Sequence, residues 1–379
     1  MLTRSYVTAV ASMIAATVGV GMFTLPYVAS QSGLVLVIVY FIALGLLQHW
    51  VHKLYAEIVL STKKVHRLPG YVAQYFGITS KRLVLILTSL GGYGSLLAYT
   101  LIGGDFLYQL LSPYLGGNMF MYTAVLLLLR SLIAGLDLKW IARTEVALTA
   151  GLFGTILIIA TFATQHGDLS NVALWQPSHW LLPYGPIFLA INGVLAVTNV
   201  CIIMKKEPER IKSALAWGTG LSAAVMLLFT IVVISLSGTG TTPDALSGLH
   251  DYIDPLFFNL LLIVGLATVT TAFLSVAESL EEMYVWDFNL NRGLAWVLIP
   301  TIPFLLYVAG AKDITTVISL TGAVAGGLLG ATSLALALRV KNKPQKKAPF
   351  SSLLTPGLAH ALTVLFLCGV AYQLWGMLN

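Results

Sequence analysis

Two short stretches of the sequence could expose backbone groups for ligand binding inside otherwise apolar segments. One is Gly19–Gly21, closed by Pro26, and the other is Asn192-Gly193. Glycine and proline interrupt helices, and the interrupted halves present amides and carbonyls that an intact helix would use internally. Amides that begin a half-helix suit a carboxylate, and carbonyls that end one suit an ammonium group or a cation. We therefore expect a site for a zwitterion that needs no charged side chain.

The first stretch divides these roles between its two sides. The amides near Val20 and Gly21 begin the second half of the helix and would face a carboxylate. The carbonyls near Ala15, Thr17 and Val18 end the first half and would face an amino group or a cation. Glycines in such segments also serve close helix packing, so either break alone is open to both interpretations.

The elements that must position these breaks are predicted to be membrane-spanning helices. Hydrophobic residues make up 58% of the chain and charged residues 9%, and the mean hydropathy is +0.87. Such a composition cannot coat a water-facing surface, and the apolar runs repeatedly exceed the ~18 residues that cross a bilayer. Eleven spans are predicted, at Tyr6–Ser30, Leu34–Ile58, Leu83–Leu111, Phe120–Leu136, Val146–Thr164, Tyr184–Met204, Ala214–Leu236, Ile253–Glu281, Leu294–Ala309, Ile314–Leu338 and Thr355–Gly376. We expect an all-α polytopic membrane protein surrounded by a lipid bilayer.

The positions of the basic residues support both this span count and an orientation. With eleven spans and a cytoplasmic N-terminus, Lys312 is the only one of the 21 Lys and Arg residues that falls on the other side. This asymmetry is the positive-inside pattern. The predicted location is therefore the inner or plasma membrane, with the C-terminus outside. Because the basic residues lie between apolar runs, the net charge of +6 does not indicate nucleic-acid binding.

The two interrupted spans occupy matching positions in the two halves of the chain. They are the first and the sixth spans, so they cross the membrane in opposite directions. This arrangement is typical of a 5+5 inverted repeat whose site lies at the midplane, with helices 1 and 6 broken. The predicted units are a first repeat over 1–165, a second repeat over 183–339 and an additional helix over 354–377. The matching positions favour function over packing at both breaks.

The first break also carries a family resemblance. The stretch Gly19–Tyr27 (GVGMFTLPY), followed by Gln31–Gly33, resembles the first-helix signature of the amino acid/auxin permease family. That family belongs to the amino acid–polyamine–cation superfamily, which has the leucine-transporter-like fold. Ala98–Asp105, Phe188–Gly193 and Thr270–Ser275 are similar to its third, sixth and eighth helices. Bacterial aromatic and neutral amino-acid permeases are a close second match.

The resemblance implies a substrate site at the breaks. Its residues would be Thr17, Gly19, Val20, Gly21, Tyr99, Phe188, Ala190, Ile191 and Asn192. Val20 and Gly21 would bind the substrate carboxylate with the Tyr99 hydroxyl, and Thr17 would offer its carbonyl to the amino group. The residues of 188–192 would line the side-chain pocket. Tyr99 could instead be a packed aromatic, and Asn192 could make an interhelical hydrogen bond.

The resemblance also implies a coupling cation between the first and eighth spans. A sodium ion would take oxygens from Ala15, Val18, Ala267, Thr270 and Thr271. Threonines in membrane helices also bond their own preceding turn, which is the alternative explanation for this pair. Proton-coupled relatives can place a lysine on the fifth span, and Val146–Thr164 contains none. We expect sodium over proton coupling, although Ala272 stands where a serine is usual.

Several ionisable residues lie at predicted helix ends. Arg130 is expected near the cytoplasmic end of its helix, where snorkelling or a gate ion pair explains it. Glu278, Glu281 and Glu282 are either gate partners or solvated carboxylates. His52 is expected in the cytoplasmic half of the second span, with no recognisable metal partner.

The resulting prediction is a secondary transporter, not an enzyme, that carries a neutral amino acid into the cell. The main alternative is a membrane-embedded amino-acid sensor of the same fold that does not transport. An enzyme would need a nucleophile, a base or metal ligands that converge within the spans, and no such cluster is recognised. A channel would show a pore loop or a charged ring, and neither is recognised. No resident cofactor is expected besides the coupling sodium ion, and the chain is expected to be a monomer.

Overall fold

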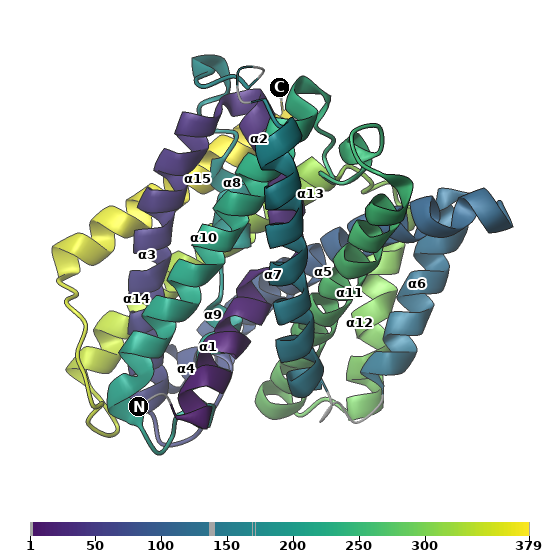
Figure 1. Ribbon diagram of the computed structural model, residues 1–379. Coiled ribbons are helices and arrows are strands. Elements are labelled where there is room, and N and C mark those ends of the chain that lie inside the picture. The colour runs from purple at the N-terminus through teal and green to yellow at the C-terminus, as the bar shows by residue number, and fades with distance from the viewer. Residues whose placement is uncertain (1–2, 136–140, 169, 171, 379) are drawn as a thin grey trace.

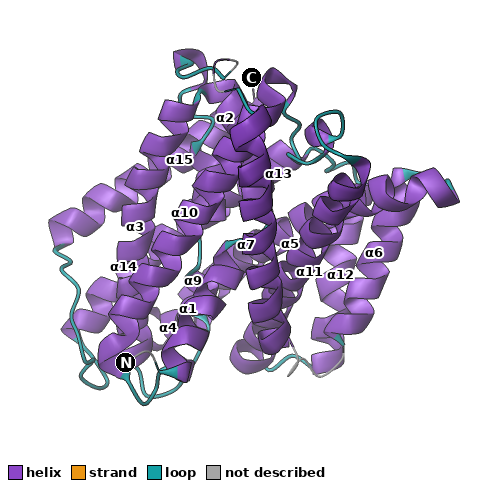
Figure 2. Cartoon of the chain, in the orientation of Figure 1, coloured by secondary structure: helices purple, strands orange, loops and turns teal. Residues whose placement is uncertain are grey.

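The protein is built from helices. The computed structural model describes residues 3–135, 141–168, 170 and 172–378. Within these ranges every regular element is helical (Figure 2), which confirms the predicted all-α class. The main helices are α1 (Arg4–Thr17), α2 (Val20–Ser32), α3 (Leu34–Ser61), α4 (Leu68–Phe76), α5 (Ile78–Leu115), α6 (Met119–Ala134), α7 (Ile141–His166), α8 (Tyr184–Ala190), α9 (Val194–Ile203), α10 (Ile211–Ser237), α11 (Pro255–Glu282), α12 (Arg292–Val308), α13 (Ile314–Leu320), α14 (Gly327–Asn342) and α15 (Pro356–Leu378).

Membrane-spanning helices dominate the described part of the chain. Seven of them are long and apolar enough to cross a bilayer, or eight when the bent pair α1 and α2 counts as one span. Three shorter apolar helices add to these, among them Met119–Ala134 and Arg292–Val308. The protein is therefore a multi-pass membrane protein. The count of eleven and the division into two inverted repeats stay predictions, and Leu136, the predicted end of the fourth span, lies outside the described residues.

Both predicted helix breaks are present. Helix α1 ends at Thr17 and α2 begins at Val20, with a bend of 54° between them. At the break, Val18 has φ −79° and ψ 85°, and Gly19 has φ −127° and ψ −145°, so neither residue is helical. In the sixth predicted span, α8 and α9 are separated by the non-helical residues Ile191–Gly193. The interruptions thus fall where glycine and asparagine weaken the helix.

The helices surround the two breaks from all sides. Helices α6 and α12 form one side of the molecule, α3, α14 and α15 form the other, and α1 and α9 lie between them (Figure 1). The end of the bundle that carries α4 and the N-terminus is at the bottom of Figure 1 and is called the α4 end below. The opposite end carries the connection between α7 and α8 and is called the far end.

Candidate functional site

A cavity of 1210 Å³ connects the two helix breaks with the α4 end. At the breaks its wall is formed by Gly19–Gly21 and by Asn192-Gly193. Toward the α4 end it passes Arg67 and Glu282. The residues that line it include none from the described parts of the connections at the far end. The cavity is therefore one-sided.

The first break leaves backbone groups without partners. The amides of Val20 and Gly21 are the first of α2, and they donate to no backbone acceptor in the described chain. The carbonyls of Ala15 and Val18 likewise receive no backbone hydrogen bond there, whereas the Thr17 carbonyl accepts from the Gly19 amide at 3.0 Å. Free amides and free carbonyls thus lie on opposite sides of the break, as the zwitterion prediction requires.

The two breaks lie against each other because glycine occupies both contact points. A Cβ on Gly21 would lie 2.6 Å from the Cα of Ala190, and one on Gly193 would lie 2.8 Å from Thr17 Oγ1. The start of α2 therefore packs on the backbone of α8, and the start of α9 packs on the end of α1. Only residues without a side chain allow this approach.

The predicted substrate residues mostly line the cavity. Thr17, Gly19, Val20, Gly21, Tyr99, Phe188, Ala190 and Asn192 are all on its wall, whereas Ile191 is fully buried and is not. The Tyr99 hydroxyl lies over the first break, 2.7 Å from where a Cβ on Gly19 would be.

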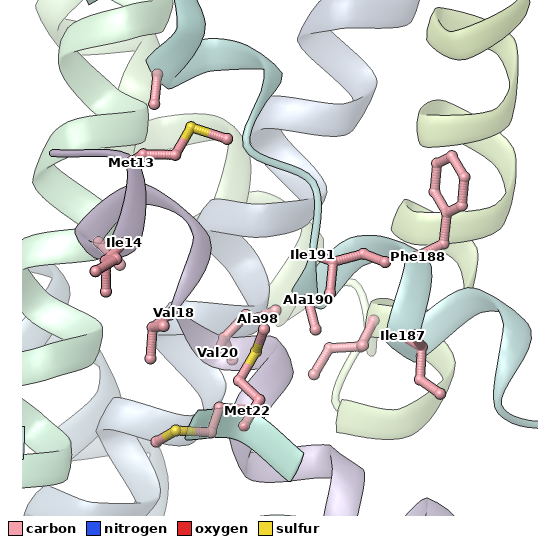
Figure 3. Packing of buried hydrophobic residues seen from close by; sticks show 14 of the residues in the cluster. Met13, Ile14, Val18, Val20, Met22, Ala98, Ile187, Phe188, Ala190 and Ile191 are labelled. Carbon is pink, nitrogen blue, oxygen red and sulfur yellow. The ribbon is translucent and has the colours of Figure 1, made fainter. Parts of the chain in front are cut away.

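Phe188 points the other way. Its ring extends to the side away from Val18 and Val20 (Figure 3) and contacts the Phe366 ring of α15 edge to face, at 5.6 Å between centroids. Phe188 therefore forms part of the wall and also packs on α15, and Ala190 is the residue of α8 that meets the first break.

Two side chains cap the start of α9. Asn192 Oδ1 accepts from the Val194 amide at 3.3 Å, and His52 Nε2 accepts from the Gly193 amide at 3.2 Å. These are amides that a helix N-terminus leaves without internal partners. The role of Asn192 is therefore partly structural, and that of His52 was not recognised from the sequence, since nothing in α3 indicates which helix its ring faces.

The residues predicted to hold sodium do not share one orientation. Thr271 Oγ1 donates to the Thr268 carbonyl at 3.0 Å, within its own helix. Thr270 Oγ1 instead accepts two hydrogen bonds from Arg130, from Nε at 3.1 Å and Nη2 at 2.9 Å. A guanidinium next to Thr270 would repel a second cation at that oxygen.

Arg130 does not snorkel, and it forms no gate ion pair with the residues that the structure describes, so that expectation is wrong. Its side chain is fully buried, Nη1 donates to the Tyr99 carbonyl at 2.9 Å, and the guanidinium lies over the Phe273 ring. A buried guanidinium needs such partners because its donors cannot reach water. Gly103 of α5 leaves the space for this group, since a side chain there would collide with the guanidinium.

A polar network lies where the cavity approaches the α4 end. Arg67 pairs with Glu282 at the end of α11, donating from Nε to Oε2 at 3.0 Å, and also donates to the Leu195 carbonyl of α9 at 2.9 Å. His66 Nδ1 lies 3.0 Å from Asp287 Oδ1 in the same region. Glu282 is thus a partner in an ion pair, which was one of its two predicted states.

Aromatic packing lies between the breaks and the far end. The Phe23 ring of α2 contacts Phe106 of α5 and Phe229 of α10 edge to face, at 5.2 and 5.8 Å between centroids. All three side chains are almost completely buried. Beyond them, Ser247 Oγ donates to Asp244 Oδ2 at 2.6 Å and Gln109 donates to Ser247 Oγ at 2.6 Å. The site is therefore covered on its far side and open toward the α4 end.

Comparison with known proteins identifies the fold. No protein-family profile and no curated protein matches the sequence. The structure of MhsT in complex with L-phenylalanine superposes with a TM-score of 0.74 over 98% of this chain and 98% of that one, at 16% identity. The structure of a mutant of the Eremococcus coleocola manganese transporter superposes with a TM-score of 0.68 over 99% and 88%, at 13% identity.

The chain has a leucine-transporter-like fold. The high coverage of both comparisons extends this assignment to nearly every helix. At identities this low the leucine-transporter-like fold is what the three proteins share. Membership of the amino acid/auxin permease family stays a prediction from the first-helix motif.

Proposed function

We propose that this protein is a secondary transporter that moves a neutral amino acid into the cell by alternating access, with sodium as the coupling ion. The observation that carries the proposal is the pair of helix breaks that meet at a one-sided cavity. Free amides and carbonyls at one break match the carboxylate and amino groups that all amino acids share. The leucine-transporter-like fold supports the same conclusion.

The chemistry around the breaks favours an uncharged substrate side chain. The wall there contains Tyr99, Ala190 and Asn192. The charged residues of the lining lie toward the α4 end, and they are Arg67, Glu278, Glu281, Glu282 and Arg292. A basic or acidic side chain would lose its hydration at the breaks without gaining an opposite charge. MhsT was crystallised with L-phenylalanine, which makes that amino acid a sensible first ligand to test.

The sodium part of the proposal rests on oxygens near the end of α1. The carbonyls of Ala15 and Val18 lack backbone partners, and α1 contacts α11, which carries Ala267 and Thr271. Hard carbonyl and hydroxyl oxygens suit a hard alkali cation. Because Thr270 faces the Arg130 guanidinium, we leave Thr270 out of the proposed ligand set.

Reconstitution tests the proposal directly. Purified protein in proteoliposomes is supplied with radiolabelled neutral amino acids, including L-phenylalanine, under a sodium gradient, a proton gradient or neither. We expect accumulation of at least one neutral amino acid, driven by the sodium gradient. Accumulation driven by the proton gradient alone would show that the coupling ion is the proton and not sodium. Binding without accumulation under any gradient would instead identify the protein as a sensor of the same fold.

A further inference from the structure

His52 links three helices at the second break. It lies in α3, is fully buried, and has a hydrogen-bond partner at each ring nitrogen. Nδ1 lies 3.1 Å from Thr219 Oγ1 on α10, and Nε2 lies 3.2 Å from the amide nitrogen of Gly193, the N-cap residue directly before α9. A buried imidazole with both nitrogens engaged fixes the relative positions of the groups that it joins.

The geometry determines the protonation state of this ring. A backbone amide can only donate, so Nε2 must carry the lone pair that accepts from Gly193. The ring proton then lies on Nδ1 and is donated to Thr219 Oγ1. A doubly protonated imidazolium would point an N–H at the Gly193 N–H, next to the positive end of the α9 dipole. The arrangement therefore requires a neutral His52.

On the described helices around His52, basic residues outnumber acidic ones, so a proton on the ring would find little compensation. Among the helices that pack against α3, the described residues of α2, α8 and α9 include no Asp, Glu, Lys, Arg or His. Helix α10 carries only Lys212, in its first turn, and α14 carries Arg339 and Lys341 in its last turn. On α3 itself, His49 lies one turn before His52 and Lys53 follows directly, and both oppose a positive charge. The acidic residue of α3, Glu57, lies five positions after His52, and its Oε2 accepts from the Ser352 amide at 2.8 Å.

Gly193 in turn determines how the breaks meet. It lines the cavity and packs against Thr17 at the end of α1. A change in its hydrogen bond to His52 therefore acts on the wall of the proposed substrate site and on the start of α9. Among the described residues, the other side chain that caps this start is Asn192, which belongs to the break itself and cannot anchor α9 to α3.

We propose that His52 is a positioning residue that anchors the second helix break while it is neutral, and that its protonation releases the start of α9. The hydrogen-bond switch follows from the geometry alone. Its role in the transport cycle, as a link between pH and the exchange of cavity conformations, rests on the proposed function.

The chain offers a native reporter for this motion. Cys201 lies on α9, two turns after Gly193, and its side chain is buried, whereas the other cysteine, Cys368, is exposed. In the full-length protein with Cys368→Ser, the rate at which a maleimide labels Cys201 measures how often α9 moves. Rates are divided by those of the denatured protein at the same pH, which removes the intrinsic pH dependence of the thiol.

We expect the normalised labelling rate to rise at least about five-fold between pH 7.5 and 5.5. This is the increase in opening expected when one buried hydrogen bond is lost. His52→Gln keeps an acceptor for Gly193 but cannot titrate, so its labelling should stay slow and independent of pH. Thr219→Val removes the partner of Nδ1 without touching the cavity and should speed labelling already at pH 7.5. Equal rates at both pH values in the Cys368→Ser protein, or the same pH response in His52→Gln, would overturn the proposal.

Uptake measured on the same preparations separates this inference from the proposed function. A labelling response to pH without amino-acid uptake would refute transport and leave the His52 switch intact. Amino-acid uptake together with a Cys201 labelling rate that does not depend on pH would refute the His52 switch and leave transport intact. If the His52→Gln protein does not fold, the pH response of the Cys368→Ser protein and the effect of Thr219→Val still decide the question.

Discussion

The contact between Gly19 and Tyr99 gives the sharpest test of the substrate site. In Gly19→Ala, the new Cβ would lie 2.7 Å from the Tyr99 hydroxyl oxygen and 3.1 Å from Cε1. The hydroxyl must therefore move away from the break. Loss of its proposed hydrogen bond to the substrate carboxylate costs about 1.5–3 kcal/mol, which corresponds to about 12- to 150-fold weaker substrate binding. The φ of Gly19, −127°, is negative, so the substitution does not place alanine in the left-handed region.

A second substitution makes the prediction specific. Tyr99→Phe removes the atom that clashes but also the hydroxyl proposed to bind the substrate carboxylate, at a cost of about 1.5–3 kcal/mol. The double variant should therefore bind no more weakly than Tyr99→Phe alone. Gly21→Ala is the matched control, because its Cβ would meet the backbone of Ala190, which cannot yield, and Tyr99→Phe should not rescue it.

The assay is equilibrium binding to purified protein of the amino acid that accumulates best in proteoliposomes, with thermal unfolding measured in parallel. Unchanged affinity in Gly19→Ala would refute the placement of Tyr99 over the break. Additive losses in the double variant would show that the two positions act independently, and the proposed role of the hydroxyl would then fail.

Three further outcomes follow from the structure. Thr271→Val should abolish the dependence of uptake on sodium concentration, whereas Thr270→Val should preserve it. The reverse pattern would show that Thr270, and not Thr271, belongs to the ion site. Arg130→Lys should lower the melting temperature, because an ammonium cannot keep all three hydrogen bonds and each costs about 1.5–3 kcal/mol; an unchanged melting temperature would contradict this. Arg67→Gln should lower the melting temperature more than Glu282→Gln does, because Arg67 also donates to α9, and equal effects would reduce its role to the ion pair.

The sequence predicted the helix breaks well because each break is caused by residues at the break itself. Gly19 interrupts a helix through its own lack of a side chain, and the free amides of Val20 and Gly21 follow directly along the chain. Substrate residues away from the first break, such as Tyr99 and Ala190, were instead predicted from the family resemblance. These predictions needed no knowledge of how distant helices pack.

The orientation of side chains around each helix could not be predicted in this way. Hydropathy indicates that a helix is buried, but it does not indicate which neighbour a given residue faces. Phe188 faces α15, Thr270 faces Arg130 and His52 faces the second break, and each partner lies far away in the sequence. Arg130 was misjudged for the same reason, because nothing near it in the sequence indicates the space left by Gly103.

The packing of Phe23 and the free amide of Gly21 are joined by the short, rigid start of α2. Gly21, whose amide is free, and Phe23, which packs on Phe106 and Phe229, are separated by roughly 3 Å along the axis of one helix. A helix moves as a stiff body over so short a distance, so a tilt that withdraws the aromatic ring also shifts the amide. The packing toward the far end and the position of the proposed carboxylate site are thus coupled through one short stretch of α2.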